Sequence, residues 1–86
     1  MVAYTASKAA VAALTVALAE EVVKADILVN AIAPSTMDTA ANRKAMPKAD
    51  FSAWTKVEDV AATILFLASP ENKVTRGGIV PVYGRS

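Results

Sequence analysis

One short segment of the chain is almost wholly apolar: Ile27-Leu28-Val29-Asn30-Ala31-Ile32, which is followed closely by Pro34. Its residues do not alternate between apolar and polar, so the pattern indicates a strand buried on both faces. Strands of this kind belong to parallel sheets that helices cover on both sides. We therefore predict a strand over residues 27–33 in an α/β fold with a parallel sheet.

A long helix is predicted before this strand. Residues 4–24 contain no Gly or Pro, and most of them favour helix. Val11, Leu14, Leu18 and Val22 follow one another at steps of three and four, the spacing of one helix face. A helix, a short turn and a buried strand form the second half of a βαβ unit. The first strand of that unit is not found in these 86 residues, so we expect an incomplete sheet.

Residues 35–54 predict a long connection. They are rich in turn-forming and polar residues, with one short helix expected around residues 40–45. A connection of this length with little structure of its own is typical of a cover over a site. Phe51 and Trp54 either line a substrate site or fix this segment to the core, and we favour the anchoring role.

A second helix and a second strand follow. The spacing Thr55-x-x-Glu58 forms a capping box before an apolar run with helical periodicity, which predicts a helix over residues 55–69. The segment Ile79-Val80-Pro81-Val82-Tyr83 predicts a short strand over residues 79–83. This strand should lie near an edge, because Pro81 has no backbone N–H to donate.

Composition excludes several classes of function. The chain carries 9 Lys+Arg and 8 Asp+Glu, a net charge of +1, so we expect no nucleic-acid partner and no binding to anionic membranes. It has no Cys and no His. This absence excludes disulfides, zinc sites built from Cys and His, and mechanisms that use a catalytic His. We expect no metal ion.

Residues 9–19 form the longest uncharged apolar stretch, and its 11 residues are about half of the ~20 that span a bilayer. We therefore predict no membrane span. Lys8 followed by this stretch and by Ala17-Leu18-Ala19 also has the outline of a secretory signal. We favour an alanine-rich helix of a cytoplasmic protein, since the absence of cysteine gives no support for export.

Tyr4 and Lys8 are the residues best suited to chemistry. They lie four positions apart, so a helix places them on one face. A neighbouring ammonium favours the phenolate and lowers the pKa of a tyrosine toward values at which it can transfer a proton at neutral pH. The pair alone is weak evidence, because most such pairs are a solvated lysine beside a half-buried tyrosine.

The order of the motifs along the chain strengthens the interpretation of Tyr4 and Lys8 as a catalytic pair. Tyr4-Thr5-Ala6-Ser7-Lys8 opens the long helix, the apolar strand runs into Ala33-Pro34, and Gly77-Gly78 precedes the last strand. This order resembles the C-terminal half of the short-chain dehydrogenase/reductase family. Residues 37–55 are similar to the corresponding segment of dihydropteridine reductase and related bacterial reductases. The resemblance implies the C-terminal part of a Rossmann-type, doubly wound parallel sheet.

The resemblance also implies roles for individual residues. Tyr4 would be the general acid, and Lys8 would lower its pKa and hydrogen-bond the nicotinamide ribose. Pro34, Met37 and Thr39 would lie in the loop that meets the nicotinamide carboxamide or the phosphates of NAD or NADP. Ser35 stands where the family usually has Gly, which puts the backbone of this loop in question.

The glycine-rich turn of the family, its nucleotide-selecting residue and its catalytic Ser are not found in this sequence. Gly77-Gly78 does not replace that turn, because it precedes a strand, whereas a phosphate-binding turn opens a helix. Met1 lies just before the tyrosine motif. We therefore expect a truncated segment that self-associates through helix 4–24, because the matching helix of the family packs across a dimer interface.

Two functions stay open from the sequence. The chain derives from an NAD(P)H-dependent reductase that acts on a dihydropteridine-like or small carbonyl substrate, or it is by itself a non-catalytic, oligomerising module. A role at a membrane surface is disfavoured by the absence of a basic face. Asn30 is interpreted as structural, because a polar residue in an apolar strand needs a hydrogen-bond partner within the fold. Two interpretations are open for the basic cluster of Arg43, Lys44 and Lys48, contact with cofactor phosphates or full solvation, and we favour solvation.

Overall fold

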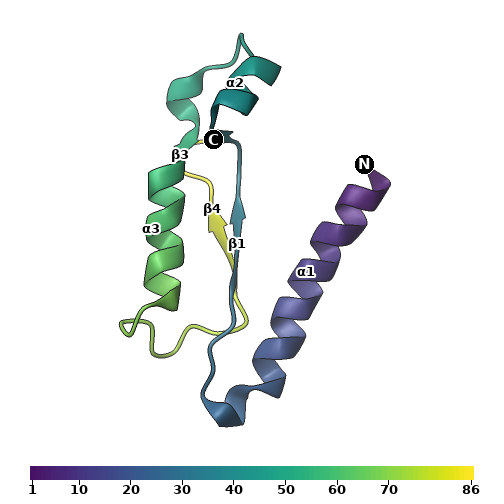
Figure 1. The fold of residues 1–86 in the computed structure, drawn as a ribbon, viewed down its shortest axis with the longest axis vertical. Helices are drawn as coiled ribbons and strands as arrows, with labels where there is room; N and C mark the ends of the chain where they lie inside the picture. Colours follow the sequence, from purple (N-terminus) through teal and green to yellow (C-terminus); the bar gives the residue numbers. More distant parts are fainter.

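The computed structural model describes residues 1–86 (Figure 1). Its α-helices are α1 (Val2–Glu21), α2 (Ala40–Ala45) and α3 (Val57–Ala68). Its strands are β1 (Ala31–Pro34), β2 (Met37–Asp38), β3 (Thr55–Lys56) and β4 (Ile79–Val82). Two short 3₁₀ helices, η1 (Val23–Ala25) and η2 (Phe51–Ala53), complete the chain.

The central pair of strands is parallel. β1 pairs with β4 from Ala31 opposite Ile79 to Pro34 opposite Val82. Figure 1 shows α3 on one side of this pair and α1 on the other. A parallel pair with helices on both sides is the α/β arrangement predicted from the sequence, and it forms a partial, Rossmann-type sheet.

The bounds of the first helix differ from the prediction of 4–24. α1 begins at Val2 and ends at Glu21, and the chain continues through η1 to Asp26, whose φ of 56° lies in the left-handed region. Glu20 and Glu21 place negative charge at the carboxyl end of the helix dipole, and no basic residue lies in the last turn. The dipole therefore does not explain the early end; the helical segment tightens into η1 and stops at the left-handed backbone of Asp26.

The first strand is shorter than predicted and lies further along the chain. The prediction placed it over residues 27–33, whereas the ladder covers only Ala31–Pro34. Asn30 explains the difference, because its side-chain oxygen accepts the N–H of Gly78 at 3.0 Å and its amide donates to the Thr75 carbonyl at 2.8 Å. The backbone donor that would extend the ladder is thereby used by a side chain. Asn30 has the structural partners that the sequence required.

The capping box predicted at Thr55 and Glu58 is wrong. Thr55 lies in β3, opposite Met37, and its hydroxyl oxygen is buried without a hydrogen-bond partner. Lys56 precedes the first helical residue and makes no side-chain cap. The pairing of Thr55 with β2 keeps its backbone extended, so the helix begins at Val57 rather than at residue 55. Glu58 and Asp59 lie in the first turn, where their charge favours the helix dipole.

The segment predicted as a connection over 35–54 has more structure than expected. α2 occupies residues 40–45, where a short helix was expected, and β2 and η2 lie on either side of it. The last strand ends at Val82 rather than at residue 83.

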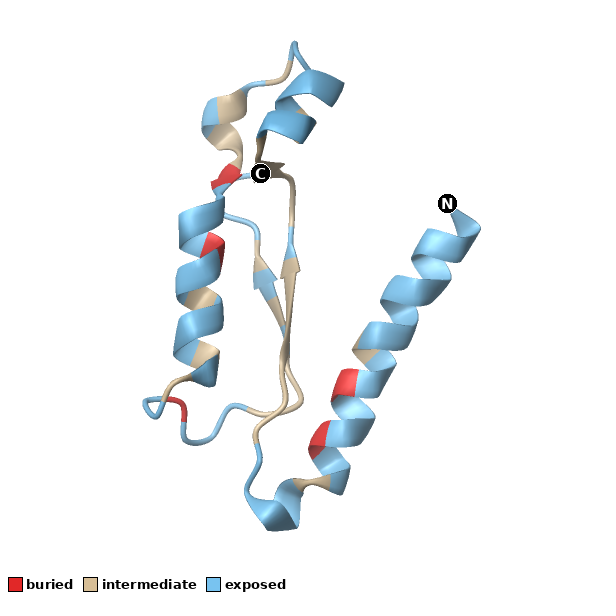
Figure 2. Ribbon diagram, in the orientation of Figure 1, coloured by how far each residue is buried: buried red, intermediate tan, exposed pale blue.

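Little of the molecule is buried (Figure 2). Ala19 and Val60 are the only buried apolar residues, and most of α1 and α3 is exposed. The strand predicted to be buried on both faces is only partly covered in this chain. By length and composition alone, α1 is also apolar enough to cross a membrane, a test that core helices and N-terminal signal sequences pass too. The uncharged stretch of residues 9–19, on which the prediction of no span rests, is only part of this 20-residue helix.

Candidate functional site

A groove with a volume of about 560 Å³ lies between α1 and β1, and it runs along β1 into the loop that follows it. One end of the groove, at Pro34, Ser35 and Met37, matches the place where open α/β sheets bind ligands, outside the carboxyl ends of the strands. The N-terminal part of α1 lies toward that end of β1 (Figure 1). The groove is mostly apolar, and its lining comprises Tyr4, Lys8, Val11, Ala12, Ala31, Ile32, Ala33, Pro34, Ser35, Met37 and Ile79.

Tyr4 and Lys8 lie on the same face of α1 and both face the groove. The Lys8 Nζ atom lies over the Tyr4 ring, 5.5 Å from its centroid. Tyr4 is 59% exposed, so its hydroxyl is accessible to a molecule in the groove. The helix therefore presents a proton donor and a cation to the same space.

The loop after β1 contributes the opposite wall. Pro34 and Met37 line the groove, whereas Thr39 does not. The Thr39 hydroxyl accepts the backbone N–H of Asn42 at 3.1 Å and so caps α2. The Asn42 amide in turn donates to the Met37 carbonyl at 2.8 Å. The structure thus brings Tyr4, Lys8, Pro34 and Met37 together and gives Thr39 a structural contact.

Ser35 does not need the conformational freedom of glycine. Asp26 is the only residue other than Gly with a positive φ, so the loop takes backbone angles open to any residue at Ser35. The Ser35 hydroxyl donates to the Tyr83 carbonyl at 3.1 Å and contacts the Ser86 hydroxyl at 2.5 Å. The side chain thereby connects the groove loop to the turn that follows β4.

Asp38 and Arg43 form an ion pair that sequence reasoning missed. Arg43 Nε donates to Asp38 Oδ1 at 2.6 Å, and Arg43 Nη2 donates to Oδ2 at 2.9 Å. These hydrogen bonds, with a smaller contribution from the charges of Arg43 and Lys56, lower the pKa of the Asp38 carboxyl. The available signal was an acidic residue five positions before a basic one, across the start of α2. Arg43 was instead interpreted as one of a solvated cluster.

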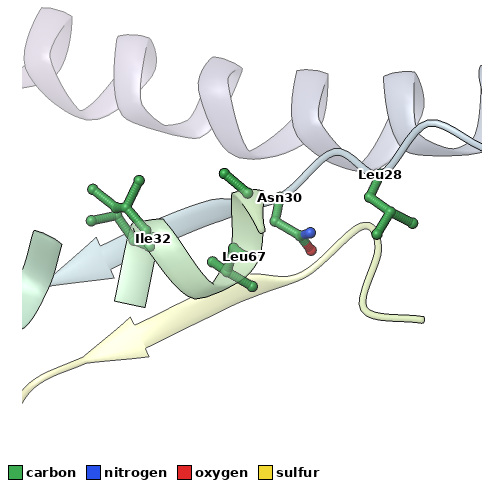
Figure 3. A pocket seen from close by; sticks show the side chains of 6 residues that line it. Leu28, Asn30, Ile32 and Leu67 are labelled. Atoms are coloured by element: carbon green, nitrogen blue, oxygen red, sulfur yellow. The ribbon is translucent and has the colours of Figure 1, made fainter. Parts of the chain in front are cut away.

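A second pocket, of about 350 Å³, lies between α3 and the segment leading into β1 (Figure 3). Leu28, Asn30 and Ile32 line it from one side and Leu67 from the other. The polar atoms of Asn30 are bonded to Thr75 and Gly78, and no titratable group lines the pocket. It offers apolar packing and no chemistry. The chain has no group of three or more Asp, Glu, His or Cys side chains that would hold a metal ion.

Sequence comparison extends over nearly the whole chain. The family profile described as Enoyl-(Acyl carrier protein) reductase matches residues 1–84. The chain is 36% identical over 89 residues to a 3-oxoacyl-[acyl-carrier-protein] reductase of Thermotoga maritima, covering 94% of this chain and 36% of that protein. It is 37% identical over 92 residues to 2-dehydro-3-deoxy-D-gluconate 5-dehydrogenase of Bacillus subtilis, covering 95% and 36%. The chain spans about a third of the length of these curated relatives.

Solved structures show the same relationship. A mutant 4-hydroxyisoleucine dehydrogenase complexed with NADH and succinate superposes with a TM-score of 0.86 at 26% identity, over 98% of this chain and 39% of that one. A 3-oxoacyl-[acyl-carrier protein] reductase with bound NAD from Brucella melitensis gives a TM-score of 0.78 at 31% identity, over 95% and 32%. Both neighbours hold a nicotinamide nucleotide, which supports NAD or NADP as the cofactor by resemblance.

Proposed function

Because this chain belongs to the short-chain dehydrogenase/reductase family, we propose that it forms the proton-donating, nicotinamide-facing part of an NAD(P)H-dependent reductase. The observation that carries this proposal is the groove in which Tyr4 and Lys8 of α1 face Pro34 and Met37 after β1. Its volume of about 560 Å³ lies within the range of small-molecule sites. An apolar lining with a few polar groups suits a nicotinamide ring and its ribose.

Tyr4 is the general acid in this proposal. When bound, the reduced nicotinamide supplies a hydride to the substrate. Tyr4 donates its phenolic proton to the substrate oxygen or nitrogen that gains negative charge. The ammonium of Lys8, already over the Tyr4 ring, stabilises the negative oxygen that remains on the tyrosine. The same ammonium is free to donate a hydrogen bond to the ribose.

Residues of the loop after β1 hold the cofactor in this proposal. Thr39 contributes less than Pro34 and Met37, because it does not line the groove. Pro34 and Met37 form the wall against which the nicotinamide packs. The Thr39 hydroxyl, outside the groove lining, accepts a hydrogen bond from Asn42, and its own proton is available for a ligand that extends beyond Met37. The sequence resemblance of residues 37–55 noted above is the basis for proposing a dihydropteridine-like or small carbonyl substrate.

A second proposal concerns the chain by itself, as a non-catalytic module that self-associates through α1. Val11, Leu14 and Leu18 are 53%, 62% and 38% exposed on this helix. Unpartnered apolar side chains in such number favour contact with another protein surface. Residues 1–84 all match the family, so we interpret α1 as a helix of the domain in a cytoplasmic protein, rather than as a membrane span.

Titration of the 86-residue chain with NADH and NADPH tests the first proposal. Nucleotide fluorescence and Trp54 emission report binding, and oxidation of the nucleotide with a small carbonyl substrate reports activity. We expect Lys8→Ala to raise the dissociation constant about tenfold, by loss of roughly one charged hydrogen bond. We expect Tyr4→Phe to leave binding within about twofold, because the phenol acts on the substrate, while substrate reduction is lost.

Lys24→Ala is the matched control, since it removes the same charge at the far end of α1, in η1. Equal binding by the wild type, Lys8→Ala and Lys24→Ala would show that the groove is not the nucleotide site. If the wild type shows no saturable binding at millimolar nucleotide, the first proposal fails. The second proposal, a non-catalytic module that self-associates through α1, then stands.

A further inference from the structure

Residues 36–56 form a self-contained lobe, which we call the 36–56 lobe. Its two ends are joined by the parallel pairing of β2 with β3, Met37 opposite Thr55 and Asp38 opposite Lys56. The Thr55 N–H also donates to the Thr36 carbonyl at 3.3 Å. A surface segment whose ends lie together and whose own side chains fill it behaves as one compact unit.

Arg43 is the side chain that crosses this lobe. Its guanidinium makes two hydrogen bonds to the Asp38 carboxylate, at 2.6 and 2.9 Å. The same guanidinium lies over the Phe51 ring, 4.6 Å from its centroid. Phe51 packs against Trp54 with ring centroids 4.9 Å apart. One residue of α2 therefore connects β2 to the aromatic pair near β3.

The connection reaches the candidate site through β2. Asp38 is the neighbour of Met37, which lines the nucleotide groove. We propose that Arg43 is a positioning residue, because it joins Asp38 to Phe51, keeps the 36–56 lobe closed and so fixes Met37 at the wall of the groove. This inference rests on the proposed function of the groove as a nucleotide site.

Charge alone does not account for this role. Exposed ion pairs contribute little on their own, and the Arg43 side chain is 52% exposed. The arrangement here requires a planar group that donates two parallel hydrogen bonds and stacks on a ring at the same time. Lysine has the same charge but lacks both properties. The conservative substitution Arg43→Lys should therefore fail to restore the lobe.

The test compares the full 86-residue chain with Arg43→Ala, Arg43→Lys and the control Lys44→Ala. Lys44 is the neighbouring residue on α2, is exposed and forms no ion pair, so its substitution removes the same charge without touching the lobe. Trp54 is the only tryptophan, and its emission and near-ultraviolet circular dichroism report the aromatic pair. NADH titration reports the groove, and far-ultraviolet circular dichroism reports the helices.

We expect both Arg43 variants to shift Trp54 emission to longer wavelength, to weaken its near-ultraviolet signal and to raise the NADH dissociation constant about fivefold. The helix content of both Arg43 variants should equal that of the wild type. The Lys44→Ala chain should equal the wild type in its Trp54 spectra, its NADH dissociation constant and its helix content. If Arg43→Ala loses its helices, Arg43→Lys and Asp38→Asn take its place, because each also removes the paired hydrogen bonds between Arg43 and Asp38. Their Trp54 spectra and NADH dissociation constants are then compared with those of Lys44→Ala.

Two results overturn the inference. Trp54 spectra in the Arg43 variants that equal those of Lys44→Ala would show that Arg43 does not close the lobe. Altered spectra with an unchanged NADH dissociation constant would show that the lobe does not position the groove. If the wild type binds no nucleotide, the proposed function fails and the positioning of a nucleotide site fails with it, whereas the Trp54 spectra still show whether Arg43 closes the lobe.

Discussion

The Asp38 carboxyl carries a pH dependence that can be worked out from its contacts. Hydrogen bonds from Arg43 lower its pKa in the folded chain. A carboxyl with a lowered pKa contributes stability above its unfolded pKa, about 3.9, and loses that contribution as the pH falls through the lower, folded value. We expect Asp38→Asn to reduce the free energy of unfolding at neutral pH, with the difference from wild type beginning to shrink near the unfolded pKa of about 3.9 and vanishing only below the lowered, folded pKa.

Urea denaturation of the wild type and of Asp38→Asn, repeated at about every pH unit between roughly pH 2 and pH 7, checks this prediction. The control is the same substitution in an Arg43→Ala background, where the pH-dependent difference should be much smaller because only Lys56 still acts on the carboxyl. A difference of equal size in both backgrounds would mean that Asp38 acts through some other contact.

At the scale of residues, the sequence located the groove pair but not the ion pair. Tyr4 and Lys8 are related by helix periodicity, a local rule that fixes which residues share a face. Asp38 and Arg43 lie on different elements, and their contact depends on the turn between β2 and α2. Thr39 was assigned to a ligand by resemblance, whereas its most evident contact is the N-terminus of α2.

Thr55 gives the sharpest prediction at the scale of elements. If it capped α3, Thr55→Val would cost about 1 kcal/mol of stability through loss of the cap. In the structure its hydroxyl is buried without a partner, so replacement by a methyl group of similar shape should leave the free energy of unfolding unchanged or raise it. Urea denaturation of the two chains measures the sign. A clear destabilisation would show that the hydroxyl has a partner in solution.

The elements that the sequence placed well are those with local causes. The end of α3 at Ala68 follows from Ser69 and Pro70, and residues 40–45 lack Gly and Pro between turn-forming neighbours. The start of β1 has a distant cause. The Asn30 side chain accepts the N–H of Gly78, 48 residues further along the chain, and the pairing of β1 with β4 begins at the next residue, Ala31 opposite Ile79. No periodicity within residues 27–33 carries that information. The mistaken capping box has the same origin, because β2 holds Thr55 in a strand.

The whole molecule exposes more surface than its mass predicts. A compact monomer of 8.9 kDa has about 4800 Å² of accessible surface, whereas this chain has 6319 Å². Its radius of gyration is 15.2 Å, against about 12 Å for a compact domain of this length. The excess of about 1500 Å² is nearly twice what one partner contributes to a standard protein interface. The fold therefore has ample surface for a partner, and α1 supplies much of its apolar part.

We expect the 86-residue chain to self-associate through α1, and Leu14→Glu to shift it toward the monomer. Leu14 is 62% exposed near the middle of the helix, so a carboxylate there would have to be desolvated in any contact made by this face. Light scattering coupled to size-exclusion chromatography at several concentrations gives the mass. Val74→Glu is the matched control, because Val74 is 82% exposed in the turn after α3, away from α1. A wild-type mass of 8.9 kDa at every concentration would contradict self-association, and equal effects of the two substitutions would place the contact elsewhere than on α1.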